Sequence, residues 1–246
     1  MYYFASDTHL GHGEQTKSRE RERMFVEWLE SVSHDAKEIF LLGDIFDFWY
    51  EYKRVVPKGF IRTLSTLATL SERGIKIHFF AGNHDMWLGN YLTEEGGVIV
   101  HTSAEIVMLG NKRVYLAHGD EIYAKYLCGA KIINAIFRCG WVRWLFSRIV
   151  HPDLALKFGH WWSGHSRKSK AIAAEFLGED DFMIREARKI TKEKNIDYFI
   201  FGHNHCAEDY SAEGIRALFL GHWLGEEPVY AVLNEEGKLE LKKVKA

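Results

Sequence analysis

The chain has 246 residues, of which 47% are hydrophobic and 27% charged, and its formal net charge at pH 7 is −2. This composition predicts a globular protein with a sizeable core rather than a disordered chain, and the charge gives no overall signal for a nucleic-acid partner. The apolar segment 2–5 is too short for a signal peptide, and Arg138, Arg143 and Arg148 interrupt the long apolar stretch near residue 140, so we expect a cytoplasmic protein without a membrane span.

Five short apolar runs have the composition of β-strands, and each is followed by polar residues. They cover residues 2–5, 38–42, 75–80, 114–117 and 198–201. After the first run, Phe25, Trp28 and Val32 recur at helical spacing within 19–33, and Pro57 suits the first turn of a further helix. Shorter strands are expected at 98–101, 105–109 and 113–117, the last two joined by a turn at 110–111.

Residues 123–174 break this alternation of strands and helices. The pattern predicts helices that are both apolar and basic, with nine Lys or Arg residues and a single acid, Asp153. Such an insertion suits a ligand with phosphates at one end and an apolar part at the other, although a helical layer whose arginines face water has the same composition. After it we expect a helix over 181–194 and two hairpins, which turn at 213–214 and 235–237.

The polar residues that end the five runs form five motifs. They are Asp7-Thr8-His9, Gly43-Asp44-Ile45-Phe46-Asp47, Gly82-Asn83-His84-Asp85, His118-Gly119-Asp120 and Gly202-His203-Asn204-His205. The first four recur at roughly the length of one strand and one helix, so we expect a sheet to gather them along one edge. For the Asp44 motif taken alone, helix capping or a solvated loop is the better explanation, and the case for a site comes from the four other motifs that repeat the pattern.

Together the motifs offer seven oxygen or nitrogen ligands for metal ions. These candidate ligands are Asp7, His9, Asp44, Asn83, His118, His203 and His205. They are too many for one small cation and include too few acids for calcium, but they suit two first-row divalent ions that share a carboxylate, for which Asp44 is the natural bridge. Two such ions bind phosphoryl oxygens and hold a water as hydroxide near neutral pH, so no Ser or Cys nucleophile is needed.

The five motifs, in this order, resemble those of the calcineurin-like metallophosphoesterases over most of the chain, from Asp7 to His205. The resemblance implies a mixed α/β fold, a four-layer αββα sandwich, as a single domain over 1–246 with a helical lid insertion at 123–174. It implies two metal ions, one held by Asp7, His9, Asp44 and His205 and the other by Asp44, Asn83, His118 and His203. His84 matches the histidine that protonates the leaving group or contacts the phosphate. The implied catalytic residues are therefore Asp44, Asn83, His84 and His118.

Within this superfamily the chain most resembles the UDP-2,3-diacylglucosamine hydrolases of the lipid A pathway. The features that carry the resemblance are the segment 43–49, the basic helical insertion, its closing segment 167–172, and Leu220-Gly221-His222-Trp223. They imply a lid over the acyl chains, manganese as the usual metal, and attack of water on the α-phosphorus to release UMP and 2,3-diacylglucosamine 1-phosphate. The implied substrate contacts are Asn83, His84, Trp49, Arg167, Lys168 and His203. The basic, apolar insertion also leaves open peripheral docking on the cytoplasmic face of the inner membrane.

One residue departs from that family, because its best-known members carry arginine at the position of His84. The departure leaves open a paralogue that acts on another lipid or nucleotide diphosphate. A phosphodiesterase or phosphatase of soluble nucleotides is a further alternative, although the apolar lid argues against it. A non-catalytic scaffold that keeps the fold is open too, although the complete ligand set counts against it. The sequence also leaves open whether Trp141 and Trp161-Trp162 line an acyl pocket or pack between helices, and whether Asp47 orients a metal ligand or is a solvated loop acid.

Overall fold

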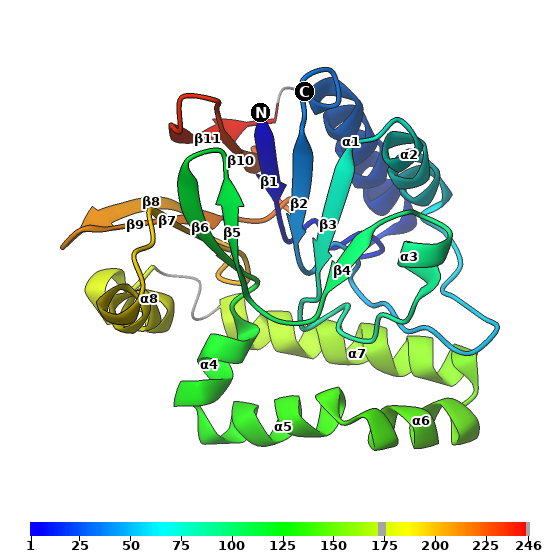
Figure 1. The fold of residues 1–246 in the computed structure, drawn as a ribbon. Coiled ribbons are helices and arrows are strands. Elements are labelled where there is room, and N and C mark those ends of the chain that lie inside the picture. The colour runs from blue at the N-terminus through cyan, green and yellow to red at the C-terminus, as the bar shows by residue number, and fades with distance from the viewer. Residues whose placement is uncertain (172–175, 245–246) are drawn as a thin grey trace.

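Two β-sheets packed face to face form the centre of the molecule (Figure 1). The computed structural model describes residues 1–171 and 176–244, apart from the side chains of some helical residues between 128 and 171, which include Arg167 and Lys168. The six-stranded sheet has the order β11-β10-β1-β2-β3-β4, and the five-stranded sheet has the order β5-β6-β7-β9-β8. The strands of the first sheet are β1 (Tyr2–Ala5), β2 (Glu38–Leu42), β3 (Lys76–Phe80), β4 (Ile99–His101), β10 (Val229–Leu233) and β11 (Leu239–Lys243). Those of the second are β5 (Glu105–Leu109), β6 (Lys112–Ala117), β7 (Tyr198–Phe201), β8 (Ala207–Ala212) and β9 (Ile215–Leu220).

Strands β1, β2, β3 and β4 run parallel, with Tyr2 beside Glu38 and Glu38 beside Lys76 in register. Parallel neighbours need a crossover connection, which the intervening helices supply. In the second sheet β6, β7 and β9 are parallel, while β5 and β8 pair antiparallel at its edges. The carboxyl ends of the parallel strands therefore bring their following loops to one end of the sandwich.

Helices cover the outer face of each sheet (Figure 1). On the six-stranded sheet lie α1 (Gln15–Val32), α2 (Ile61–Glu72) and α3 (Tyr91–Glu94), and on the five-stranded sheet lies α8 (Phe182–Glu193), preceded by the short η1 (Gly178–Asp180). Buried apolar residues form three clusters, one at each interface between layers: Phe25 and Ile39 belong to the first, Phe4 and Leu218 to the second, and Phe199 to the third. Each sheet is thus buried on both faces, which confirms the predicted αββα sandwich.

Four consecutive helices between β6 and η1 lie at the end of the sandwich where the parallel strands finish. They are α4 (Asp120–Tyr126), α5 (Cys128–Arg138), α6 (Gly140–Ile149) and α7 (Pro152–Ala171). In Figure 1, α7 crosses beneath both sheets, and α5 and α6 lie on its far side. Core side chains donate to the backbone of these helices, from Trp87 Nε1 to the carbonyl of Phe137 at 2.6 Å and from the Tyr50 hydroxyl to that of Arg143 at 2.9 Å. Among the described residues, no helix has the length and apolar character that crossing a bilayer requires.

Most predicted elements are found within a few residues of their expected ends, and the exceptions have local causes. Helix α2 begins at Ile61, so Pro57 precedes it instead of lying in its first turn, because Phe60 takes a left-handed backbone with φ +57° just before the helix. Helix α1 begins at Gln15, ahead of the predicted start. The helical segment begins at Asp120, directly after Gly119, and therefore before the expected boundary at 123.

Candidate metal centre

The five polar motifs meet at one end of the sandwich, but they come from two sheets. Strands β1, β2 and β3 carry the first three motifs, whereas β6 and β7 of the other sheet carry the last two. The expectation of a single sheet edge is therefore wrong. The hairpin of β5 and β6 begins a second sheet, so the motifs face one another across the sandwich rather than along one rim.

The first cluster of potential metal ligands consists of Asp7, His9, Asp44 and His205, whose nearest ligand atoms lie within 4.8 Å of one another. The two imidazole Nε2 atoms of His9 and His205 are 3.0 Å apart. His205 Nε2 is 3.2 Å from Asp7 Oδ1, and His9 Nε2 is 3.9 Å from Asp44 Oδ2. Residues nearly 200 positions apart in the sequence thus direct two oxygens and two nitrogens at one point.

The second cluster shares Asp44 with the first and adds His118, His203 and Asn83. His118 Nε2 lies 3.4 Å from Asp44 Oδ2 and 3.3 Å from His203 Nδ1. The side-chain oxygen Oδ1 of Asn83 is 3.4 Å from the same Nε2 atom. All seven predicted ligands are therefore brought together in two groups, and the single oxygen Oδ2 of Asp44 belongs to both.

Hydrogen bonds outside the clusters decide which atom each side chain directs inward. His118 Nδ1 donates to the carbonyl of Leu42 at 2.8 Å, which leaves the lone pair of Nε2 for a metal ion. One oxygen of each aspartate is likewise occupied, since Asp44 Oδ1 accepts from the backbone of His84 at 2.8 Å and Asp7 Oδ2 from the backbone of His203 at 2.9 Å. The other oxygens, Asp44 Oδ2 and Asp7 Oδ1, are buried and accept no hydrogen bond among the described residues.

These two buried oxygens fit metal ions. A buried carboxylate oxygen without a donor is costly, and a divalent cation supplies the missing partner. The donor set of carboxylates, imidazoles and one amide suits first-row divalent ions, and no thiolate is among the seven donors. Asp44 Oδ2, directed at both clusters, is placed to bridge a pair of ions.

The electrostatics of the site also favour cations. Burial opposes the charged form of Asp44, but His118 and then His84 outweigh it and hold the pKa of this carboxyl well below its usual range. Burial opposes the charged form of Asp7, but His205, whose Nε2 lies 3.2 Å from Asp7 Oδ1, and then His118 outweigh it, so the pKa of Asp7 is about 2. Burial alone would lower the pKa of His118, but Asp44 raises it to about 10. Protons thus balance the carboxylates in the metal-free protein, and metal ions would displace them.

Five of the seven ligands adopt a left-handed backbone, which is rare for residues with a side chain. They are Asp7, His9, Asp44, His203 and His205, with φ between +45° and +68°. Such conformations cost about 1–3 kcal/mol each and cluster at functional sites. Asp85, which the sequence analysis did not single out as a site residue, holds one of these turns: its buried carboxylate accepts from the backbone of Gly82 at 2.7 Å and Ile45 at 2.8 Å. Its position within Gly-Asn-His-Asp was the only signal for it.

His84 lies between the clusters and an apolar cavity. Its Nδ1 donates to the carbonyl of Asp47 at 3.0 Å, which places Nε2 at the metal centre, 3.8 Å from Asp44 Oδ2. Asn83 and His84 also line the cavity, whose other walls belong to the core and to α5 and α7: Phe48, Trp49, Met86, Trp87, Phe137, Phe158 and Gly159. The cavity therefore shares Asn83 and His84 with the metal centre.

The other predicted substrate contacts have mixed outcomes. Trp49 lines the cavity, although most of its indole is buried against Phe46. Its Nε1 donates to the carboxylate of Glu51 at 3.0 Å. Trp141 and Trp161 are 66% and 62% exposed and do not line this cavity. The side chains of Arg167, Lys168 and Trp162 lie outside the described residues.

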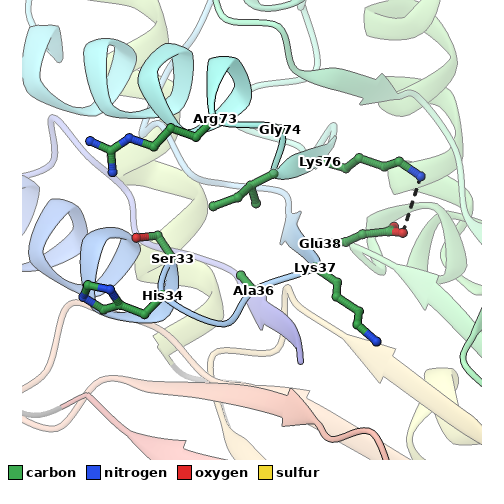
Figure 2. Close-up of a pocket in the computed structure, with 9 residues that line it drawn as sticks. Ser33, His34, Ala36, Lys37, Glu38, Arg73, Gly74 and Lys76 are labelled. Carbon is green, nitrogen blue, oxygen red and sulfur yellow. Dashed lines mark ion pairs between the residues drawn. The ribbon is translucent and has the colours of Figure 1, made fainter.

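A second pocket lies at the opposite end of the six-stranded sheet, beside the amino ends of β2 and β3 (Figure 2). Two of its lysines are engaged in ion pairs, since Lys76 lies 3.7 Å from Glu38 and Lys37 lies 2.9 Å from Glu235, which is outside the pocket. None of the seven ligands lines it. The metal centre is therefore the stronger candidate for the functional site.

Comparison with known proteins agrees with this site. The profile of the calcineurin-like phosphoesterase family matches residues 2–207, a range that contains all five motifs. The chain belongs to the calcineurin-like phosphoesterase family. Among curated relatives, a UDP-2,3-diacylglucosamine hydrolase of Porphyromonas gingivalis is 38% identical over 236 residues, which covers 90% of each chain. A UDP-2,3-diacylglucosamine hydrolase of Aeromonas salmonicida is 27% identical over 245 residues and covers 96% of this chain and 91% of its own.

Solved structures include an archaeal phosphodiesterase that covers 98% of both chains with 12% identity and a TM-score of 0.48. Family membership and the ligand clusters together make this calcineurin-like phosphoesterase a metal-dependent hydrolase that uses divalent ions. The residues that fit those ions come from every one of the five motifs.

Proposed function

We propose that the protein hydrolyses the pyrophosphate of UDP-2,3-diacylglucosamine, releasing UMP and 2,3-diacylglucosamine 1-phosphate. The observation that carries this proposal is the apolar cavity that shares Asn83 and His84 with the metal centre. A substrate with a pyrophosphate next to acyl chains needs polar ligands and an apolar channel side by side. The relatives named UDP-2,3-diacylglucosamine hydrolase, found at up to 38% identity, support the same substrate.

Two divalent ions, for which we propose manganese, would polarise the phosphoryl oxygens and supply a water as hydroxide near neutral pH. Asp7, His9, Asp44 and His205 would hold one ion, and Asp44, Asn83, His118 and His203 the other. The oxygen of the Asn83 amide faces His118, 3.4 Å from its Nε2, and we propose that Asn83 also contacts a phosphoryl oxygen of the substrate. His203 lies beside the same group and completes the proposed phosphate contacts.

His84 is the proposed proton donor. In the reaction, the water oxygen bonds to the α-phosphorus, and the bond from that phosphorus to the bridging oxygen breaks. The bridging oxygen leaves with the lipid phosphate. With Nδ1 committed to the Asp47 carbonyl, a protonated His84 directs its Nε2–H at the metal centre, where it can donate to the leaving oxygen or to a phosphoryl oxygen.

Helices α5, α6 and α7 form the proposed lid over the acyl chains, and their outer surface supports contact with a membrane. Large apolar side chains are exposed there, among them Trp144 at 52% and Ile149 at 72%, and the Arg148 guanidinium stacks on Trp144 at 5.4 Å. Exposed tryptophans beside arginines suit an anionic bilayer surface. We expect the protein to float with phosphatidylglycerol vesicles and Trp144→Ala to reduce the bound fraction; equal flotation with neutral vesicles and by the variant would refute the contact.

The reaction is tested by product analysis with Mn²⁺ and UDP-2,3-diacylglucosamine in oxygen-18 water. We expect UMP to form and to carry the label, and Asp44→Asn, which removes the bridging charge, to form none. Label in the lipid phosphate would place the attack on the β-phosphorus instead, and absence of UMP would refute the proposed substrate. The hydrolases that this chain resembles carry arginine at the position of His84. Other lipid diphosphates are therefore tested in the same assay.

A further inference from the structure

The carboxylate of Asp47 contacts two parts of the molecule, helix α7 and the metal centre. Its oxygen Oδ1 accepts a hydrogen bond from the Ser163 hydroxyl of α7 at 2.8 Å, and both side chains are buried. The same oxygen lies 3.6 Å from Nδ1 of His9, the ring nitrogen opposite the one that faces Asp7 and Asp44. One carboxylate oxygen thus joins the helical segment to a potential metal ligand.

Helix α7 is seated on, that is packed directly against, the loop after β2 that carries Asp47. Gly159, one turn before Ser163, lies so close to Phe48 that an added Cβ would come within 2.3 Å of the phenyl ring. Residues four apart share a face of a helix, so Gly159 and Ser163 meet the neighbours Phe48 and Asp47 together. The small side chains let the helix axis approach the loop after β2, and the serine then reaches the carboxylate.

We propose that Asp47 is a positioning residue that couples the seating of α7 to metal binding by His9. When Nε2 of His9 binds a metal ion, Nδ1 must carry the proton and needs an acceptor, and a carboxylate in that place fixes the ring and raises its basicity. Ser163 holds the carboxylate in that place only while α7 is seated. The inference rests on the proposed metal centre and does not depend on the identity of the substrate.

Coupling of this kind is reciprocal. If a seated α7 strengthens metal binding at the cluster of Asp7, His9, Asp44 and His205, then metal binding must stabilise the seated helix by the same factor. The distance of 3.6 Å between Asp47 Oδ1 and His9 Nδ1 is longer than that of a hydrogen bond. We therefore expect metal binding at Nε2 to shorten this distance. Metal occupancy and closure of the helical segment would then rise together.

Asp47 also has the chemistry of a ligand, since His9, Asp47 and His84 form a third group of close donors. Asp47 faces Nδ1 of His9, however, whereas the first cluster faces Nε2 on the other side of the same ring. The carboxylate therefore cannot bind the ion that Nε2 binds. Its remaining role toward that ion is to orient the histidine.

The test measures metal affinity and helix protection rather than turnover. Mn²⁺ binding is followed by electron paramagnetic resonance, and amide exchange of α7 by hydrogen–deuterium exchange with and without Mn²⁺. We expect Asp47→Asn to weaken Mn²⁺ binding by about 10- to 100-fold, the range for partners that orient a ligand, and Ser163→Ala to weaken it less. Mn²⁺ should slow exchange of α7 in the wild type and do so much less in Ser163→Ala.

The matched control is Ser147→Ala on α6, whose hydroxyl lies away from Asp47 in sequence and donates to the Trp144 carbonyl within its own helix at 2.7 Å. It should keep wild-type affinity and wild-type protection by Mn²⁺. Unchanged Mn²⁺ affinity in Asp47→Asn, or Mn²⁺-dependent protection of α7 in Ser163→Ala equal to that of the wild type, overturns the proposal. Failure of the substrate assay would leave these readouts unaffected, so the two proposals fail separately.

Discussion

His84 faces both the metal centre and the apolar cavity, yet it belongs to neither of the two main ligand clusters. We therefore expect His84→Ala to lower kcat by about 100- to 10,000-fold, the usual effect of losing a general acid, and to change Mn²⁺ affinity by less than about threefold. His84→Arg keeps a donor at the position and should retain more activity than His84→Ala. Steady-state kinetics together with a Mn²⁺ titration of each variant separate the two effects, and an alanine variant with wild-type kcat would exclude the role.

Among single residues, the site residues that could be predicted from the sequence are the polar ones that follow a strand. The seven ligands were predicted because each comes directly after an apolar run, and the structure brings all seven together. Ser163 was not predicted. It lies 116 positions from Asp47, inside a helix whose composition indicates only a basic and apolar surface, so nothing local connects the two residues.

At the scale of elements, the loop after β3 holds the loop after β2 in place through close backbone contact. A Cβ added at Gly82 would lie 2.3 Å from Asp44 Oδ1 and 2.4 Å from the backbone nitrogen of Asp44. We expect Gly82→Ala to displace Asp44, to weaken Mn²⁺ binding by about 10-fold or more, and to destabilise the fold by about 1–3 kcal/mol through overpacking. Isothermal titration and urea denaturation measure the two quantities.

Gly140→Ala is the matched control for this prediction, because no heavy atom lies within 4 Å of a Cβ added at that first residue of α6. It should bind Mn²⁺ as the wild type does. If Gly82→Ala kept wild-type affinity, the close approach of the two loops would have no part in shaping the metal centre.

The elements themselves were predicted to different degrees, for physical reasons. The strands from β1 to β7 were found close to their predicted ends because each is an apolar run with polar boundaries. The start of α2 was wrong because the backbone has a positive φ at both Gly59 and Phe60, so the helix begins only at Ile61. The partition into two sheets could not follow from motif spacing, since β3 and β6 are each followed by a ligand motif but pair in different sheets.

At the scale of the whole molecule, the sandwich carries a partly buried chain of polar side chains, Glu38, His78 and His101, at one edge of its central interface. His78 Nδ1 lies 2.9 Å from His101 Nε2, and His78 Nε2 lies 3.0 Å from Glu38. The rings stack on Phe40 and Phe80, which belong to the core between the sheets. The other charged groups that face this chain are Lys76, 3.7 Å from Glu38, and Glu105, 4.0 Å from His101.

Burial lowers the pKa of His78 and of His101, against the attraction of Glu38 and Glu105. The unfolded chain, with ordinary histidine pKa values of about 6.5, therefore binds more protons than the folded protein in acid, so stability rises with pH up to about 6.5 and is lost below it. We expect the urea midpoint of metal-free protein to fall between pH 7 and pH 5, and to fall less in His78→Gln, which keeps a polar side chain but does not titrate. Measuring both proteins without metal removes the effect of metal release, and a parallel fall in the two midpoints would show that this chain of side chains does not set the acid sensitivity of the fold.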